Sequence, residues 1–260
     1  MYADWMILLL KVFLVPTFIG LVSVSSRKWG PIVGGWLIGL PLTSGPVAFF
    51  LALEQGDVFA SAASKAIMMG IVSVFAFACT YAWSATRHQW HISLLAGLCA
   101  YLACTLLLNS IGWPLLVSFV FVLGALVATL LLMPQVSWSK SRYRMGWSEI
   151  PARMFSATVL VFVITGVAQW LGPQLTGLLT PFPIYATILA VFTHRFEGGA
   201  NAIKLLKGVV AGSFTFTMFF LMISTTIIDW GVGWAFVSAM LISILTHAIS
   251  FEFLRRGSRF

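Results

Sequence analysis

The sequence predicts an all-α polytopic membrane protein with nine transmembrane helices. Of its 260 residues, 60% are hydrophobic and only 8% are charged, and the mean hydropathy is +1.00. A soluble domain carries about 25% charged residues. Apolar runs recur from end to end, each near the roughly 20 residues that a helix needs to cross a bilayer. These runs are too long and too uniformly apolar for the alternating strands of a membrane barrel. The chain is therefore expected to form a single membrane domain, residues 1–260.

The predicted spans are joined by connections with a regular charge pattern. The spans are 5–25, 30–53, 60–84, 91–109, 112–133, 150–170, 172–193, 202–227 and 231–253. The Lys and Arg residues that lie outside the spans fall in the odd-numbered connections and the C-terminal tail. They are Arg27, Lys28, Arg87, Lys140, Arg142, Arg144, Arg195, Arg255, Arg256 and Arg259. The even-numbered connections contain only the acids Glu54, Asp57 and Asp229.

Basic connections of membrane proteins gather on the cytoplasmic side. The alternation therefore predicts a multi-pass protein of a bacterial inner membrane, with a periplasmic N-terminus and a cytoplasmic C-terminus. The formal net charge of +8 is expected to reflect this orientation and not a nucleic-acid partner.

Two segments of the chain repeat one another at a constant offset. "WGPIVGGWLIGLP" at 29–41 matches "LGPQLTGLLTPFP" at 171–183 without a gap. Matches continue along the same offset at Gly56 with Gly198, Lys65 with Lys207, Gly70 with Gly212, and Phe77 with Phe219. Self-similarity at a fixed offset indicates an internal repeat.

The repeat is expected to be inverted. The offset carries span 1 to span 6, and an odd number of spans between partners turns the second copy upside down. The prediction is two inverted-topology repeats of four helices, 1–110 and 143–260, joined by an unpaired fifth helix and a basic cytoplasmic loop, 111–142. Such repeats are typical of many secondary transporters.

Each repeat contains a stretch that is unfavourable for a continuous helix. "GLPLTSGP" at 39–46 and "TPFPIYAT" at 180–187 interrupt their apolar runs with prolines. Proline inside a helix costs about 3 kcal/mol or more. Broken helices at spans 2 and 7 are therefore expected, although two tolerated kinks would also fit the pattern. In inverted repeats such breaks bind the transported solute, because half-helix N-termini attract anions and freed carbonyls hold cations.

The expected substrate-binding residues lie at these breaks and at one basic pair. They are Pro41, Thr43, Ser44, Gly45, Pro183, Tyr185, Thr187, Lys65 and Lys207.

The lysine pair has two interpretations. Both side chains could snorkel to the headgroups, or they could guide an anionic substrate from either side. The same alternatives apply to Lys11 and Arg153, with snorkelling favoured. His247 is expected to pack or to form hydrogen bonds within its span, rather than to relay protons.

The sequence indicates neither catalysis nor a metal site. His-Glu-x-x-His, Gly-x-Ser-x-Gly and Walker patterns do not occur in it, and the three cysteines lack metal-ligand spacing. The protein is predicted not to be an enzyme and to use no cofactor. No acid lies in the middle of a span, so Na⁺ is favoured over H⁺ as a coupling ion.

In architecture, two inverted halves with breaks at "GLPLTSGP" and "TPFPIYAT" resemble the sodium–bile acid symporter and cation–proton antiporter families. The leading hypothesis is an alternating-access secondary transporter, ion-gradient-driven or facilitative, of a small polar or anionic solute. One alternative is a flippase for a phosphate-bearing lipid carrier. Another is an intramembrane enzyme or an assembly subunit of a membrane complex. Membrane lipids are expected partners, and a homodimer stays open.

Overall fold

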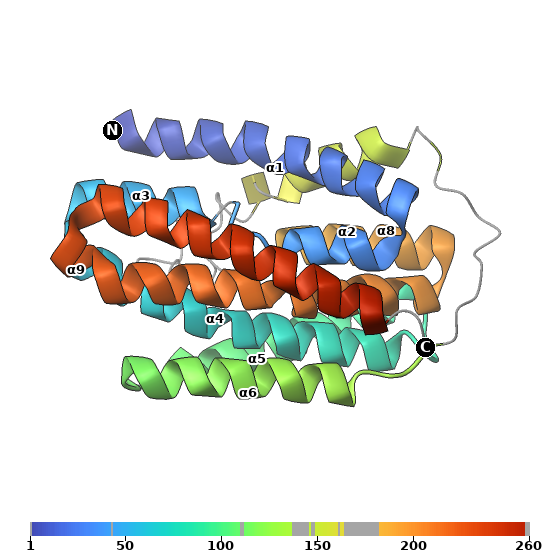
Figure 1. Cartoon of the computed structure of the whole chain (residues 1–260). Helices are drawn as coiled ribbons and strands as arrows, with labels where there is room; N and C mark the ends of the chain where they lie inside the picture. Colours follow the sequence, from blue (N-terminus) through green and yellow to red (C-terminus); the bar gives the residue numbers. More distant parts are fainter. Residues whose placement is uncertain are drawn as a thin grey trace.

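The computed structural model is a bundle of helices that run back and forth along one direction (Figure 1). It describes residues 2–42, 44–109, 112–136, 146, 149–160, 162–163 and 182–257. Within these ranges every regular element is a helix. The elements are α1 (Tyr2–Trp29), α2 (Pro31–Ile38), α3 (Ser44–Gln55), α4 (Asp57–Ser84), α5 (Trp90–Asn109), α6 (Leu115–Leu132), α8 (Ile184–Glu197) and α9 (Gly199–Gly257). Residues 149–160 are helical as well.

Four helical stretches are long and apolar enough to cross a membrane. They are Asp57–Ser84, Trp90–Leu108, Leu115–Leu132 and Gly199–Glu252. This composition agrees with the predicted membrane class. Helices also occupy most of the described parts of the other expected spans, but 164–181 fall outside the description. The count of nine spans stays a prediction.

Single glycines reverse the chain between several helices. Gly56 separates α3 from α4 with φ 84° and ψ 170°, and Gly198 separates α8 from α9 with φ 91° and ψ 163°. This backbone region is open essentially to glycine alone. Both residues stand at matching positions of the predicted repeat, and they adopt nearly the same backbone conformation.

The long element α9 consists of two helices. Gly231 interrupts it with φ 70° and ψ 170°, and the chain turns back at this point (Figure 1). The first helix of α9 therefore runs from Gly199 to Gly231, and the second from Gly231 to Gly257. They correspond to the predicted spans 202–227 and 231–253. The first is longer than predicted because single glycines, Gly198 and Gly231, connect it to its neighbours without a loop.

Helix α2 lies directly against the first helix of α9. A methyl group added to Gly35 or to Gly39 would overlap the α9 backbone at Leu205 or at Gly212. On the α9 side, Gly208 faces the α2 backbone in the same way. Such small residues at four-residue spacing let membrane helices approach closely, where packing replaces the hydrophobic effect as the driving force.

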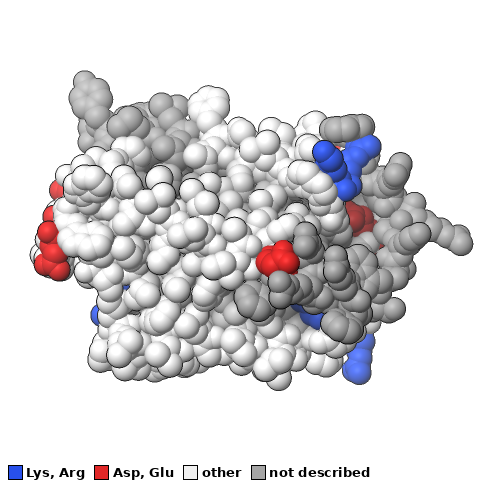
Figure 2. Space-filling model, viewed as in Figure 1, with Lys and Arg blue, Asp and Glu red and all other residues white. Residues whose placement is uncertain are grey.

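On the face that Figure 2 shows, the surface between the two ends of the bundle is largely uncharged, apart from one acidic group. Large apolar side chains are exposed along α5, α6 and the second helix of α9, including Leu107, Leu116, Leu131 and Ile244. Acids occupy the ends of α3, α4 and the first helix of α9, whereas α1 and α8 carry basic residues in their last turns. Figure 1 places the first group of ends opposite the second.

Candidate functional site

The described chain between α2 and α3 is not helical at the place of the first predicted break. Helix α2 ends at Ile38 and α3 begins at Ser44, and the described residues 39–42 between them are not helical. The Gly45 amide donates to the Pro41 carbonyl at 2.8 Å, which ties the start of α3 to the break. Thr43 lies outside the described residues.

The break faces the middle of the first helix of α9. Gly39 lies against Gly212, and a methyl group on Gly45 would come 3.3 Å from the Phe219 ring. Gly212 and Phe219 both sit near the centre of the stretch 199–230. The break therefore lies about halfway along the bundle, as Figure 1 also shows.

The second break is described only from Phe182 onward. Helix α8 begins at Ile184, directly after a buried Pro183 whose side chain offers no cap. The Thr187 amide donates to the Pro183 carbonyl at 2.8 Å. Thr180, Pro181 and the preceding part of this span lie outside the described residues. A second half-helix thus starts where the sequence predicts one, while the matched pair of breaks stays a prediction.

Side chains of the second break point toward neighbouring helices. The Tyr185 ring meets Phe18 of α1 edge-on, with centroids 5.2 Å apart, and Phe182 meets Tyr101 of α5 at 5.6 Å. Thr187 is 6% exposed, and its hydroxyl has no hydrogen-bond partner among the described residues. The start of α8 is therefore enclosed by the bundle.

Helices α3 and α8 thus both begin inside the bundle. Neither has an acidic residue in its first turn. The first amides of a helix carry a partial positive charge, and they attract anionic or strongly dipolar groups. This arrangement is suited to holding a polar group within the bundle. The described residues include no group of three or more His, Cys, Asp or Glu that could hold a metal ion.

The predicted lysine pair lies away from the breaks, at the two ends of α6. Lys65 donates through Nζ to the Trp113 carbonyl just before α6, at 3.1 Å. Lys207 donates to Gln135 Oε1 just after α6, at 3.2 Å. The 18 residues of α6 span about 27 Å. The expected site residues therefore form two groups: one at the breaks, the other divided between the ends of the unpaired helix.

A buried ionic cluster was not expected from the sequence. Arg153 is fully buried, so the favoured prediction that it snorkels is wrong. Its Nη2 lies 3.7 Å from Glu149 and 3.6 Å from Glu197, and its guanidinium lies 5.5 Å from the Phe192 ring centre. Glu149 and Arg153 stand four residues apart on one helix face, a spacing that could have revealed their pairing.

Two effects on the pKa of Glu197 oppose one another in this cluster. Glu197 follows the predicted span 172–193. Burial raises the pKa of the Glu197 carboxyl, and Arg153 counteracts that rise. The cluster joins the 149–160 helix to the last residue of α8, so it closes the basic end of the bundle.

His247 has the structural role that the sequence predicted. Its ring stacks on Trp36 of α2 with centroids 3.6 Å apart, and its Nδ1 lies 3.0 Å from the Thr215 hydroxyl. Trp36 Nε1 in turn donates to Ser250 at 2.8 Å. The packing and hydrogen-bonding prediction for His247 is confirmed, and these contacts join α2 to both helices of α9.

No protein-family model, curated protein or solved structure matches this chain. The architectural resemblance to the symporter and antiporter families therefore receives no support from these comparisons. Any assignment of function depends on the geometry of the chain itself.

Proposed function

We propose that this protein is a secondary transporter of a small polar or anionic solute. The observation that carries the proposal is the start of α3 and of α8 inside an apolar bundle. Irregular backbone at membrane depth is tolerated only where protein covers it or where it lines a water-filled cavity. We propose that the solute binds between these helix ends, as substrates do at the discontinuous helices of many transporters.

The proposed orientation places the acidic end of the bundle in the periplasm and the basic end in the cytoplasm. The positions of Glu54, Asp57 and Asp229 at the ends of α3, α4 and the first helix of α9 support it. The N-terminal end of α1 lies at the acidic end, and the C-terminus lies at the basic end (Figure 1). Labelling of cysteine-substituted Ser139 and Ser258 in intact cells tests this: modification by an impermeant reagent from outside would contradict the orientation.

The inverted repeat is part of the same proposal. Gly56 and Gly198 adopt one backbone conformation at matching positions, and Lys65 and Lys207 contact opposite ends of α6. Both pairs support two copies related by inversion around an unpaired helix. The coupling ion we favour is Na⁺, because carbonyls freed at a break can hold a cation without a buried acid.

The direct test is thermal stabilisation of the purified protein by a panel of carboxylates, phosphates, sulfates and neutral polar solutes. A solute at a hundred times its Kd stabilises the folded state by about 2.7 kcal/mol. We expect one anionic or dipolar class to raise Tm. Uptake of that solute into proteoliposomes under a Na⁺ or a pH gradient then identifies the coupling ion.

A variant at the break separates specific from general stabilisation. Replacing the first residue of α3, Ser44→Leu, should abolish the rise in Tm caused by the stabilising solute, since a bulky apolar group would cover the helix start. Gly124→Ala on α6, where a methyl group meets no atom within 4 Å, should preserve the shift. An equal shift in both variants would place the solute elsewhere.

A further inference from the structure

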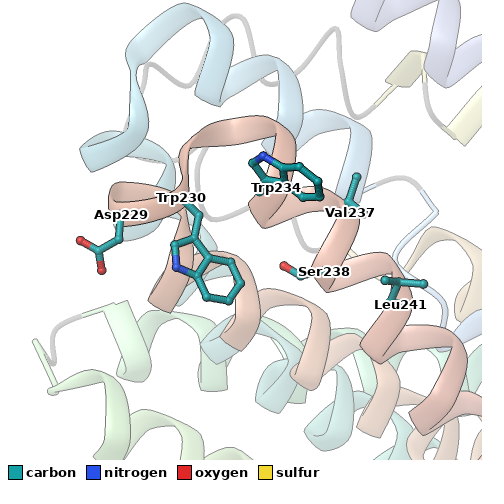
Figure 3. A pocket seen from close by; sticks show the side chains of 6 residues that line it. All are labelled: Asp229, Trp230, Trp234, Val237, Ser238 and Leu241. Carbon is teal, nitrogen blue, oxygen red and sulfur yellow. The ribbon is translucent and has the colours of Figure 1, made fainter.

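A pocket opens beside the reversal of α9, at the acidic end of the bundle. Figure 3 shows its lining of Asp229, Trp230, Trp234, Val237, Ser238 and Leu241. Trp230 belongs to the first helix of α9, and the other aromatic residue, Trp234, follows the turn at Gly231. The sharp reversal therefore places two indole rings on either side of one opening.

The rings and the acid of this pocket share one electrostatic preference. The faces of indole rings attract cations, and Trp is the strongest of the aromatic side chains in this respect. Asp229 adds a negative charge at the outer rim, with its carboxylate pointing away from Trp234 (Figure 3), and its neighbour Trp230 is 53% exposed. No Lys or Arg lines the pocket. The chemistry therefore favours an ammonium group over a bare phosphate.

The rest of the pocket is apolar and leads away from the charged end. Trp234, Val237 and Leu241 follow one another at helical spacing along the second helix of α9, with exposed fractions of 72%, 48% and 59%. Met240 and Ile244 extend this exposed apolar surface toward the other end. In a membrane such a surface contacts acyl chains, whereas Trp residues gather at the depth of the headgroups.

We infer that this pocket binds an amine-bearing phospholipid, with its ammonium group against the indole rings of Trp230 and Trp234, at the end of the pocket where Asp229 adds a negative charge. One acyl chain then lies along Val237 and Leu241. In the proposed orientation this lipid belongs to the outer leaflet. The inference needs neither the transported solute nor the inverted repeat, so it can fail or succeed independently of both.

The test uses the full chain, purified and delipidated in mild detergent. Phosphatidylethanolamine and phosphatidylglycerol with identical acyl chains are added separately, and native mass spectrometry measures the bound fraction of each. We expect roughly fivefold tighter binding of phosphatidylethanolamine, the scale of one cation–aromatic contact strengthened by a carboxylate. Equal binding of the two lipids would overturn the inference.

Variants locate the preference. Asp229→Asn and Trp234→Ala should each reduce the ratio between the two lipids to about one. Glu54→Gln removes an exposed acid from the same end of the bundle but outside the pocket, and it should keep the ratio. Trp29→Ala, at an exposed Trp of α1, serves as the aromatic control.

A folding control keeps the result interpretable. Asp229 and Trp234 are both exposed, so their variants should retain the Tm of the parent protein. Trp234→Phe keeps an aromatic ring and should keep part of the preference. An unchanged lipid ratio in Asp229→Asn and Trp234→Ala, with Tm preserved, would refute the site.

Discussion

The two halves of the first broken helix, α2 and α3, contact the first helix of α9 in different ways. Helix α2 meets it backbone to backbone, because Gly35 and Gly208 remove the side chains between them. Helix α3 meets it through a side chain, because Gly45 faces the Phe219 ring. Phe49 of α3 also lies edge-on to Phe236, at 5.1 Å, on the second helix of α9.

This difference indicates which half of the bundle can change its helix packing more easily. Interlocked backbones cannot shift without steric overlap, whereas aromatic side chains can adopt other rotamers. The α2 half is further held by the Trp36–His247 stack, and the Arg153 cluster closes the basic end. We therefore expect the basic half to be rigid, and we expect the movement that the proposed alternating access requires to occur mainly around α3.

The largest expected effect concerns the ionic cluster at the rigid end. Arg153→Met removes the cation between two buried carboxylates, and we expect a loss of about 3–5 kcal/mol of stability at neutral pH. Arg195→Met, at an exposed position of α8, should cost little. Thermal unfolding of both purified variants makes the comparison. Similar Tm values would show that the cluster does not stabilise the basic end of the bundle.

The loss in Arg153→Met should depend on pH. The pKa of Glu197 is already raised by burial, and removal of the cation raises it further. A carboxyl with a raised pKa in the folded state destabilises that state when it is ionised. The Tm difference between Arg153→Met and the parent should therefore grow as pH rises above the usual glutamate range and shrink as pH falls through it.

The next effect tests the close approach of α2 to α9. Gly208→Ala places a methyl group against the backbone at Ile32 and Trp36, and overpacking of this kind costs about 1–3 kcal/mol. The matched control is Gly124→Ala in the middle of α6, which should be neutral or stabilise by up to about 1 kcal/mol. Equal behaviour of the two variants in thermal unfolding would remove the contrast between the halves.

A smaller effect is expected on the yielding side. Gly45→Ala brings a methyl group 3.3 Å from the end of the Phe219 ring, which can move aside. We expect a cost of less than about 1 kcal/mol, and Phe219→Leu in the same chain should remove it. A loss as large as that of Gly208→Ala would mean that the α3 half is as rigid as the α2 half.

The smallest effect on stability should come from the lysines at α6. Lys65→Gln and Lys207→Gln each remove one hydrogen bond of a half-buried lysine, worth about 0.5 kcal/mol because water can replace it. If the lysines guide an anion, apparent affinity in proteoliposomes should fall more for solute from outside in Lys65→Gln, and more for solute from the cytoplasm in Lys207→Gln. Lys→Arg should preserve more activity than Lys→Gln. Unchanged transport from both sides in the double Gln variant would leave only the structural role.

Local patterns in the sequence predicted several features correctly. The proline and glycine residues at 39–46 coincide with the non-helical segment between α2 and α3, because both residue types act on the backbone at their own position. The start of α8 after Pro183 was predictable for the same reason. The sequence also favoured packing or hydrogen bonding over a proton relay for His247, because a lone histidine within a span needs a hydrogen-bond partner.

Features that depend on distant partners were not predictable. Gly35 and Gly208 become an interface only when the fold brings them together. Arg153 resembles a snorkelling residue until Glu197, from another helix, is placed beside it. The lipid pocket depends on the reversal at Gly231, which turns two tryptophans four residues apart toward one opening.

The single-residue reversals at Gly56, Gly198 and Gly231 also bear on how the chain is made. Two helices joined by a single glycine have no flexible loop between them. The second helix therefore stays next to the first as soon as the second has left the ribosome. Each such pair is therefore expected to enter the bilayer as a unit. Lengthening a reversal with a flexible insert would allow the two helices to enter separately, and during synthesis it would increase the fraction of chains with one helix left outside the membrane.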